Sequence, residues 1–377
     1  MLIMLCLAAL LLAHSNGAND NFKGFATIWG SGEADYNTAL GLATITTVVG
    51  AIAALYIANG LVASFAGHGL VPGELAGTPQ FVLAVALGAG LTVLLATRLG
   101  FPISTTHAII GGLVGSGLAA VGHDISLDKL GGTFLLPLLL SPFLSASLAA
   151  VLYWLVSRAL PEAAVASARF CVCEEQPARS VGAATVAVVP AGADLRIGTI
   201  ENCTKAGASE IRSVSVLAGV RALHFLSAGT ICFARGVNDT PKLVALLLAA
   251  RTLGVEASFW GVAAAMAVGG WLNGRRVAET MSRKIVPLAH EQGLVANLVT
   301  SGLVLSASSF GLPVSTTHVS VGSISGTGLV TGKLDRGELA KIVLSWVITL
   351  PLAALIAFGA ALLVQGMGAE SSPTFVD

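Results

Sequence analysis

Long apolar runs, rather than alternating apolar and polar positions, dominate this chain of 377 residues. An apolar helix of about 20 residues is long enough to cross a lipid bilayer. Runs of that kind fall at 39–59, 81–99, 103–121, 133–156, 214–234, 257–273, 290–310, 314–331 and 342–364, with a shorter run at 1–14. The apolar segment 241–250 is too short to cross, and we interpret it as a half-helix or re-entrant piece. The pattern predicts an all-α, polytopic membrane protein.

Residues 158–213 form the only long polar stretch of the sequence. Within it, the run at 181–190 has a strand-like composition, which leaves room for a small folded insert. We interpret the whole stretch as a linker. The sequence is therefore predicted to have three parts, which are a first transmembrane repeat at 1–157, a cytoplasmic linker loop at 158–213 and a second transmembrane repeat at 214–377.

Two motifs occur twice, in the same order, in the two predicted repeats. Residues 17–23 (GANDNFK) match residues 236–242 (GVNDTPK) at an offset of 219, and residues 100–107 (GFPISTTH) match residues 311–318 (GLPVSTTH) at an offset of 211. The repeat makes the apolar run at 1–14 a counterpart of 219–233, which favours a membrane segment there over a removable signal peptide. Small residues four apart, typical of close helix packing, follow the second motif in both copies, as Gly111, Gly115, Gly322 and Gly326.

Positive charge is unequal in equivalent loops. The loop at 274–284 carries four Lys or Arg residues and its counterpart at 60–80 carries none, while 332–341 carries three and its counterpart at 122–130 carries one. Because Lys and Arg favour the cytoplasmic side, equivalent loops are expected on opposite sides of the membrane. Five crossings per repeat would place both termini outside. Inverted repeats with broken helices are typical of secondary transporters that bind substrate between the repeats.

Composition narrows the class of protein further. The chain is 55% hydrophobic and only 11% charged, against roughly 25% charged residues in soluble domains. Twenty Lys and Arg residues balance twenty Asp and Glu residues, so the basic excess of a nucleic-acid binder is missing. These numbers exclude a soluble enzyme, a disordered protein and a nucleic-acid partner. We expect a multi-pass integral protein of the cell's inner or plasma membrane that is not an enzyme.

The first doubled motif places Asn19, Asp20, Asn238 and Asp239 in or beside apolar runs, where an ionisable side chain is costly. The glycines three residues before each Asp would allow the helix to unwind, so that carbonyl, amide and carboxylate oxygens form a cation cage. We predict a coupling-ion site in each repeat, with Na⁺ at Asp20 and Asp239 or a proton in its place. The alternative is that each Asp caps a following half-helix.

The second doubled motif combines a helix-breaking proline with three hydroxyl residues that begin the next helical run. A helix N-terminus binds anions through its free N–H groups, so two such N-termini meeting near the bilayer midplane would enclose a tetrahedral oxyanion. The predicted anion ligands are Ser104, Thr105, Thr106, Ser315, Thr316 and Thr317. The alternative is a capped, kinked helix. The histidines that follow, His107 and His318, either orient a hydroxyl or carry a proton, or are packed neutral side chains bonded to a carbonyl.

Together, the doubled G-x-N-D motif, the doubled G-x-P-x-S-T-T-H motif and the stretch GRRVAET at 274–280 resemble the inorganic phosphate transporter (PiT) family of sodium- or proton-coupled symporters. The resemblance covers essentially the whole chain. It implies an inverted-repeat fold with broken helices, a homodimer in membrane lipid, no cofactor beyond the coupling ion, and a phosphate site between the repeats. It further implies that Asp20 and Asp239 are cation-site and substrate-site carboxylates, with Asn19 and Asn238 beside them and the hydroxyls holding the anion.

The sequence also departs from that family. Family members often have a glutamate near position 47, where this chain has Thr47, and they lack the lysines found here three residues after each Asp, Lys23 and Lys242. At that spacing each lysine can pair with its Asp, and we include both lysines, with Asp20 and Asp239, among the predicted substrate-binding residues. One hypothesis is that each ammonium takes a cation site, which would favour proton coupling or a sulfate substrate. The alternative is that the lysines extend to the headgroup region.

Phosphate and sulfate differ in one respect that matters here. Phosphate keeps a proton at neutral pH and can donate it to a carboxylate, whereas sulfate has none and is repelled. The two Asp residues therefore favour phosphate, and the paired lysines weaken that argument. We predict a symporter that imports inorganic phosphate with Na⁺ or H⁺, and the alternative is a permease for sulfate or a related oxyanion with the same fold.

Overall fold

The computed structural model describes residues 1–57, 59–65, 69–122, 124–159, 169–175, 194–199, 209–249 and 254–369. The chain divides into two compact units. The larger comprises Met1–Tyr153 and His224–Asp377, and the smaller comprises Trp154–Leu223. The larger unit therefore combines segments from both predicted repeats in one body.

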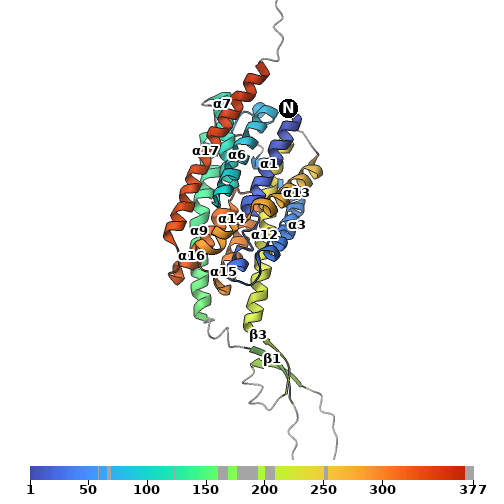
Figure 1. The fold of residues 1–377 in the computed structure, drawn as a ribbon, viewed down its shortest axis with the longest axis vertical. Helices are drawn as coiled ribbons and strands as arrows, with labels where there is room; N and C mark the ends of the chain where they lie inside the picture. The colour runs from blue at the N-terminus through green and yellow to red at the C-terminus, as the bar shows by residue number, and fades with distance from the viewer. Residues whose placement is uncertain are drawn as a thin grey trace, which may run out of the picture. The chain divides into compact units, whose positions relative to one another are not determined.

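Long helices build the larger unit (Figure 1). Seven helical segments of the described residues are long and apolar enough to cross a membrane, which agrees with the predicted multi-pass membrane protein. The elements that supply them are α1 (Leu2–Asp20), α3 (Tyr36–Ile57), α6 (Pro79–Leu99), α8 (Leu127–Lys129) continuing through the π-helix η1 (Leu130–Leu135) into α9 (Leu136–Ala159), α12 (Val216–Ala249), α13 (Val255–Asn273) and α17 (Arg336–Ala369).

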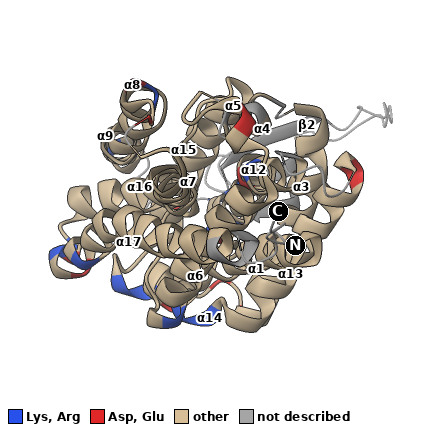
Figure 2. Cartoon of the chain, turned by 90° about the horizontal axis from the view of Figure 1, so that it is seen from above, with Lys and Arg blue, Asp and Glu red and all other residues tan. Residues whose placement is uncertain are grey.

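Three further helices and several short ones complete the unit. The further helices are α7 (Thr105–Val121), α15 (His290–Ser309) and α16 (Thr316–Thr331), and the short elements are α2 (Ala26–Gly30), α4 (Asn59–Phe65), α5 (Gly73–Ala76), α14 (Arg275–Glu279) and the π-helix η2 (Thr280–Lys284). Figure 2 shows Lys and Arg concentrated on α14 and at one end of α17, with uncharged ribbon over most of the helices. Large apolar side chains such as Ile3, Leu355 and Leu363 are more than 70% exposed, as expected of a surface that faces lipid.

Both doubled proline motifs break the chain between two helices, as predicted. α6 ends at Leu99 and α7 begins at Thr105, and in the other repeat α15 ends at Ser309 and α16 begins at Thr316. Ser104 and Ser315 are the N-caps, because their hydroxyls accept from the backbone N–H three residues later at 3.1 and 3.3 Å. The breaks thus expose two helix N-termini inside the protein.

Helices of one repeat pack directly on helices of the other. A Cβ atom at Gly111 or Gly115 of α7 would overlap backbone carbonyls of α17, and one at Gly326 of α16 would overlap a carbonyl of α9. Only glycine permits this approach of two helix backbones. The predicted small-residue packing is confirmed, and it joins each repeat to the last long helix of the other.

Two expectations about the helices were wrong. Residues 241–249 are not a separate half-helix, because α12 continues through Pro241 as one helix to Ala249. Gly17 and Gly236 do not unwind their helices either. Each lies within a helix, and a Cβ at either position would overlap the backbone of α13 or of α3. These glycines serve close helix packing instead.

The smaller unit contains an antiparallel three-stranded sheet in the order β2-β1-β3. Its strands are β1 (Arg169–Glu175), β2 (Asp194–Thr199) and β3 (Ser209–Ser215). Val172 at the middle of β1 pairs with Ile197 on one side and Arg212 on the other. The strand-like run at 181–190 lies outside the described residues. The long-helix fold is thus confirmed for the larger unit. Among the described residues, the three strands lie in the predicted linker, except that β3 extends two residues beyond it to Ser215.

Candidate functional site

Asp20 and Lys23 of the first doubled motif lie together at the end of α1. Asp20 is the last residue of α1, and Lys23 lies in the turn that follows. The two side chains form an ion pair and both are 1% exposed. The Lys23 ammonium also donates to the hydroxyl of Thr317 at the start of α16. The lysine is therefore paired inside the protein, and the alternative that it extends to the headgroups is wrong.

The second repeat forms the equivalent contacts within α12. The Lys242 Nζ atom lies 3.6 Å from Oδ1 of Asp239, and the two residues are 2% and 4% exposed. This ammonium donates to the Thr106 hydroxyl at 2.9 Å and to the Val314 carbonyl at 2.7 Å. Neither Asp caps a helix, because Asp20 ends α1 and Asp239 lies inside α12. The capping interpretation is wrong for both residues.

Each lysine thus reaches a threonine of the other repeat. The two threonines are themselves fixed across the same boundary, because Thr317 donates to the Ile103 carbonyl at 2.6 Å and Thr106 donates to the Val314 carbonyl at 3.3 Å. The N-termini of α7 and α16 therefore lie beside both lysines. The arrangement brings the two doubled motifs to one place, as their repetition suggested.

Arg235 is a member of the site that the sequence analysis missed. It is completely buried, and its Nε atom lies 3.4 Å from Oδ2 of Asp239. Its Nη atoms donate to the side-chain oxygens of Asn16 at 2.6 Å, Asn21 at 3.2 Å and Thr47 at 3.4 Å. The available signal was an arginine at the end of an apolar run, one helical turn before the second Asn-Asp pair.

Asn16 links the two carboxylates. Its Nδ2 atom lies 3.3 Å from an oxygen of Asp20, 3.3 Å from an oxygen of Asp239 and 3.0 Å from the Thr105 hydroxyl. Asn16 stands at the position equivalent to Arg235, since the two are 219 residues apart. The side chains at this pair of equivalent positions therefore meet at the centre of the site.

Asn19 and Asn238 hold the broken segments in place. Asn19 donates to the Phe101 carbonyl at 2.9 Å and accepts from the Ile103 N–H at 3.0 Å. Asn238 donates to the Val314 carbonyl at 3.3 Å and accepts from the Ser308 hydroxyl at 3.1 Å. Each amide thus fixes the loop just before a helix N-terminus of its own repeat. This geometry supports a positioning role, since both side-chain amides form hydrogen bonds with other groups of the protein.

The remaining predicted anion ligands are also buried at these N-termini. Thr105 and Thr316 are the first residues of α7 and α16 and are 5% and 3% exposed. Ser104 and Ser315 use their oxygen atoms as helix caps. The capping alternative therefore describes the two serines. The hydroxyls that contact Asn16 and the lysines are those of Thr105, Thr106 and Thr317.

The two histidines of the doubled motif lie against each other, with ring centroids 4.7 Å apart. Nδ1 of His318 lies 3.1 Å from the Leu138 carbonyl, and its ring packs on Trp346 at a centroid distance of 4.0 Å. His318 is therefore a packed histidine bonded to a carbonyl, as the structural alternative held.

We call the nine side chains at the centre of the two repeats the polar cluster. They are Asn16, Asp20, Lys23, Thr105, Thr106, Arg235, Asp239, Lys242 and Thr317, and none is more than 5% exposed. In their ordinary ionised forms, three cations and two carboxylates leave a formal net charge of +1. A buried excess charge is costly without a counter-ion, so the cluster is suited to an anion. Its carboxylates already face ammonium and guanidinium groups.

Comparisons with known proteins agree on one family. The sequence profile described as "Phosphate transporter family" matches residues 16–357. A relative from Pyrococcus abyssi, provisionally described as a phosphate permease, is 27% identical over an alignment 402 positions long, which covers 94% of this chain and 96% of that protein. A probable low-affinity inorganic phosphate transporter of Mycobacterium tuberculosis is 27% identical over an alignment 369 positions long, which covers 94% of this chain and 76% of that protein.

The fold has a counterpart among solved structures. A structure described as "The sodium-dependent phosphate transporter" superposes with a TM-score of 0.76 at 22% sequence identity, covering 97% of this chain and 99% of that chain. At that identity the likeness concerns the fold. The sequence profile extends over most of the chain and includes both doubled motifs, and this multi-pass membrane protein therefore belongs to the phosphate transporter family.

Proposed function

We propose that this protein transports inorganic phosphate across the membrane and binds it at the polar cluster. The observation that carries the proposal is the formal charge of +1 on buried side chains beside two helix N-termini. Membership of a family of transporters, rather than enzymes, supports the same function. The descriptions of the relatives name phosphate as the substrate.

Phosphate suits the donors and acceptors of the cluster. The Lys23 and Lys242 ammonium groups donate to Thr317 and Thr106 here, and an anion between the N-termini would accept from the same groups. A phosphate that keeps one proton would donate it to a carboxylate of Asp20 or Asp239. Sulfate lacks that proton and would face the carboxylates without a hydrogen bond, so we propose phosphate over sulfate.

The two lysines support coupling to protons rather than to sodium. A sodium ion at Asp20 or Asp239 would need the carboxylate oxygens that face Lys23, Arg235 and Lys242. A tethered ammonium there supplies the positive charge that a bound cation would bring. We therefore propose that H⁺ is the coupling ion and that the lysine ammonium groups take the place of bound sodium ions.

Transport then requires the lysine contacts between the repeats to open. Lys23 to Thr317 and Lys242 to Thr106 both join one repeat to the other, and the cluster is enclosed while they hold. We propose that the two repeats move relative to each other to expose the site on alternate sides. The inverted orientation of the repeats and the homodimer stay predictions, and the mass of the protein in native membrane discs tests the second.

The experiment is uptake of radiolabelled phosphate into proteoliposomes under an inward proton gradient, with unlabelled sulfate as competitor. Wild-type protein is expected to accumulate unmodified phosphate in the presence of a tenfold excess of sulfate. Thr106→Val should reduce uptake because it removes the hydroxyl that Lys242 contacts. Thr230→Val is the matched control, since that threonine of α12 is exposed and its hydroxyl donates to the Leu226 carbonyl of the same helix. Uptake of sulfate alone, or phosphate uptake abolished by sulfate, would contradict the proposal.

A further inference from the structure

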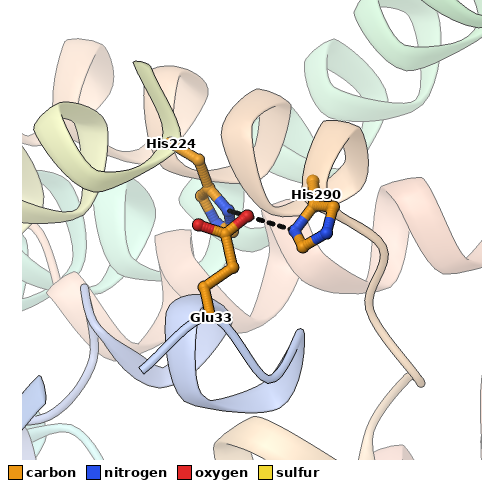
Figure 3. Close-up of side chains that lie close together, drawn as sticks. All are labelled: Glu33, His224 and His290. Atoms are coloured by element: carbon orange, nitrogen blue, oxygen red, sulfur yellow. Dashed lines mark ion pairs between the residues drawn. The ribbon is translucent and has the colours of Figure 1, made fainter. Parts of the chain in front are cut away.

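A second group of ionisable side chains lies outside the polar cluster (Figure 3). Glu33 follows α2, His224 belongs to α12, and His290 is the first residue of α15. One ligand atom from each residue lies within 4.8 Å of the other two. Both imidazole rings turn a nitrogen toward the Glu33 carboxylate, as Figure 3 shows. Three elements that are distant in the sequence therefore converge on one point.

The group is buried, with one accessible side. The His224 and Glu33 side chains are 0% and 4% exposed, and the His290 side chain is 21% exposed. Glu33 forms an ion pair with Nδ1 of His290, and its Oε1 atom lies 3.9 Å from Nδ1 of His224. A buried carboxylate requires a compensating charge, and the partly exposed His290 side chain leaves the group in contact with its surroundings on one side.

His224 is held in a fixed orientation. Its Nε2 atom lies 2.9 Å from the Thr27 hydroxyl, which in turn donates to the Gly24 carbonyl at 3.2 Å. The same hydroxyl also lies 3.2 Å from Oδ1 of Asn297. The tautomer of His224 that donates from Nε2 to Thr27 leaves the lone pair of the ring on Nδ1, which faces Glu33. A Cβ atom at Gly293 would overlap the imidazole, so the ring is also packed in place. Histidines that bind metals are oriented by the same kind of outer contact.

An ion pair alone leaves part of this arrangement unexplained. A protonated His290 would satisfy Glu33, but Nδ1 of His224 has no hydrogen-bond partner in the described part of the chain, although it is buried and directed at the carboxylate. The two imidazole rings lie edge to face at a centroid distance of 6.4 Å and do not stack. A single cation between the three groups would use both nitrogens and the carboxylate together.

From this geometry we propose that Glu33, His224 and His290 form a binding site for a divalent transition-metal ion of the zinc class. Two imidazoles and one carboxylate are a ligand set that Zn²⁺ accepts, with water as fourth ligand. Bonds of about 2.0–2.1 Å in tetrahedral geometry place ligand atoms roughly 3.3 Å apart. The 3.9 Å between Oε1 of Glu33 and Nδ1 of His224 is close to that spacing.

A metal at this point would connect the segments that carry the polar cluster. The chain from Lys23 runs through α2 to Glu33, and α12 carries both His224 and Asp239. α15 begins at His290 and carries Ser308, whose hydroxyl donates to Asn238. The bound ion would hold these three segments together, and it would enter and leave past the exposed part of His290. Zinc should therefore raise the melting temperature of the protein.

The test is zinc binding to purified protein that has been stripped with a chelator, measured by calorimetry and by metal analysis after desalting. Wild-type protein should bind one Zn²⁺ per chain and melt at a higher temperature with zinc. Glu33→Gln and His290→Ala should each weaken binding at least tenfold. Glu291→Gln is the matched control, because it removes the neighbouring carboxylate, which is not in the group. Equal binding by all four proteins, or no binding by wild type, would overturn the proposal.

X-ray absorption at the zinc edge gives a second readout that does not depend on the variants. Loaded wild-type protein should show a shell of nitrogen and oxygen neighbours with the scattering pattern of two imidazoles. A shell without imidazole scattering would place the zinc elsewhere and overturn the assignment, even if variants that fail to fold prevent the binding comparison.

Discussion

The two repeats build the same contacts on different backbones. In the first repeat, α1 ends at Asp20 and Lys23 lies in a turn, whereas in the second α12 continues through Asp239 and Lys242 to Ala249. Both lysines nevertheless pair with their own Asp and with a threonine of the other repeat. The motif therefore specifies contacts at the boundary between repeats rather than a local backbone conformation.

The charges of the two repeats differ more than their contacts. Asp20 forms an ion pair with one cation, Lys23, while Asp239 forms ion pairs with two, Lys242 and Arg235. The equivalent of Arg235 in the first repeat is the neutral Asn16. The first repeat is thus balanced and the second carries the surplus positive charge, so we assign anion attraction mainly to the second repeat.

The largest effect on phosphate binding is expected when the charge difference between the two repeats is removed. Arg235→Asn gives the second repeat the residue that the first has at this position and brings the formal charge of the cluster to zero. Removing one partner from a group of buried charges typically costs about 3–5 kcal/mol. If the free energy of phosphate binding weakens by a similar amount, phosphate affinity should fall by at least roughly a hundredfold. Equilibrium binding of labelled phosphate checks this. Arg275→Asn, whose side chain is 71% exposed, should bind like wild type. A similar loss of phosphate affinity in both variants would contradict the claim that the buried charge of Arg235 attracts the anion.

The next largest effect is a difference in stability between variants of the two lysines. Lys23→Met leaves the Asp20 carboxylate buried without a cationic ion-pair partner among the described residues and should destabilise the protein by about 3–5 kcal/mol. Lys242→Met should cost less, about 1.5–3 kcal/mol, because Arg235 still pairs with Asp239. Melting temperatures in detergent check the order. Sodium should raise the melting temperature of Lys23→Met more than that of wild type, since the substitution opens a cation site. Equal losses in the two variants would show that Arg235 does not compensate.

The smallest effect concerns the two asparagines. Asn19 makes contacts of 2.9–3.0 Å with Thr97, Phe101 and Ile103, all in the segment before α7. The contacts of Asn238 are 3.1–3.3 Å long, and one goes to its neighbour Asp239. At about 1 kcal/mol for each hydrogen bond, Asn19→Ala should lower stability by roughly 1 kcal/mol more than Asn238→Ala. Chemical denaturation measures the difference, and a larger loss in Asn238→Ala would contradict the assigned roles.

Repetition explains which parts of the site were predictable. Residues in the doubled motifs, such as Asp20, Thr106 and Lys242, could be assigned to one site because a pattern that occurs twice indicates a shared interface. Arg235 occurs in one copy only, so no repeat marked it, although its burial decides the charge of the cluster. A single arginine beside an apolar run is equally consistent with a membrane boundary.

The helix boundaries show a second limit of the sequence. The short apolar run at 241–250 suggested a half-helix, but α12 continues through Pro241 to Ala249, because packing against neighbouring helices overrides local preference. Gly17 and Gly236 suggested flexibility, and the contacts with α13 and α3 show that they permit close packing instead. The structural role of a short apolar run or of a glycine can be assigned only once the helices packed against it are known.

The central claim is that Lys23 and Lys242 take the place of coupling cations at the two carboxylates. The direct measurement is phosphate uptake by proteoliposomes in sodium-free buffer under an imposed inward proton gradient, compared with uptake under an inward sodium gradient at equal pH on both sides. The account predicts accumulation with the proton gradient and none with the sodium gradient alone. Uptake that follows the sodium gradient and is absent without sodium would contradict it.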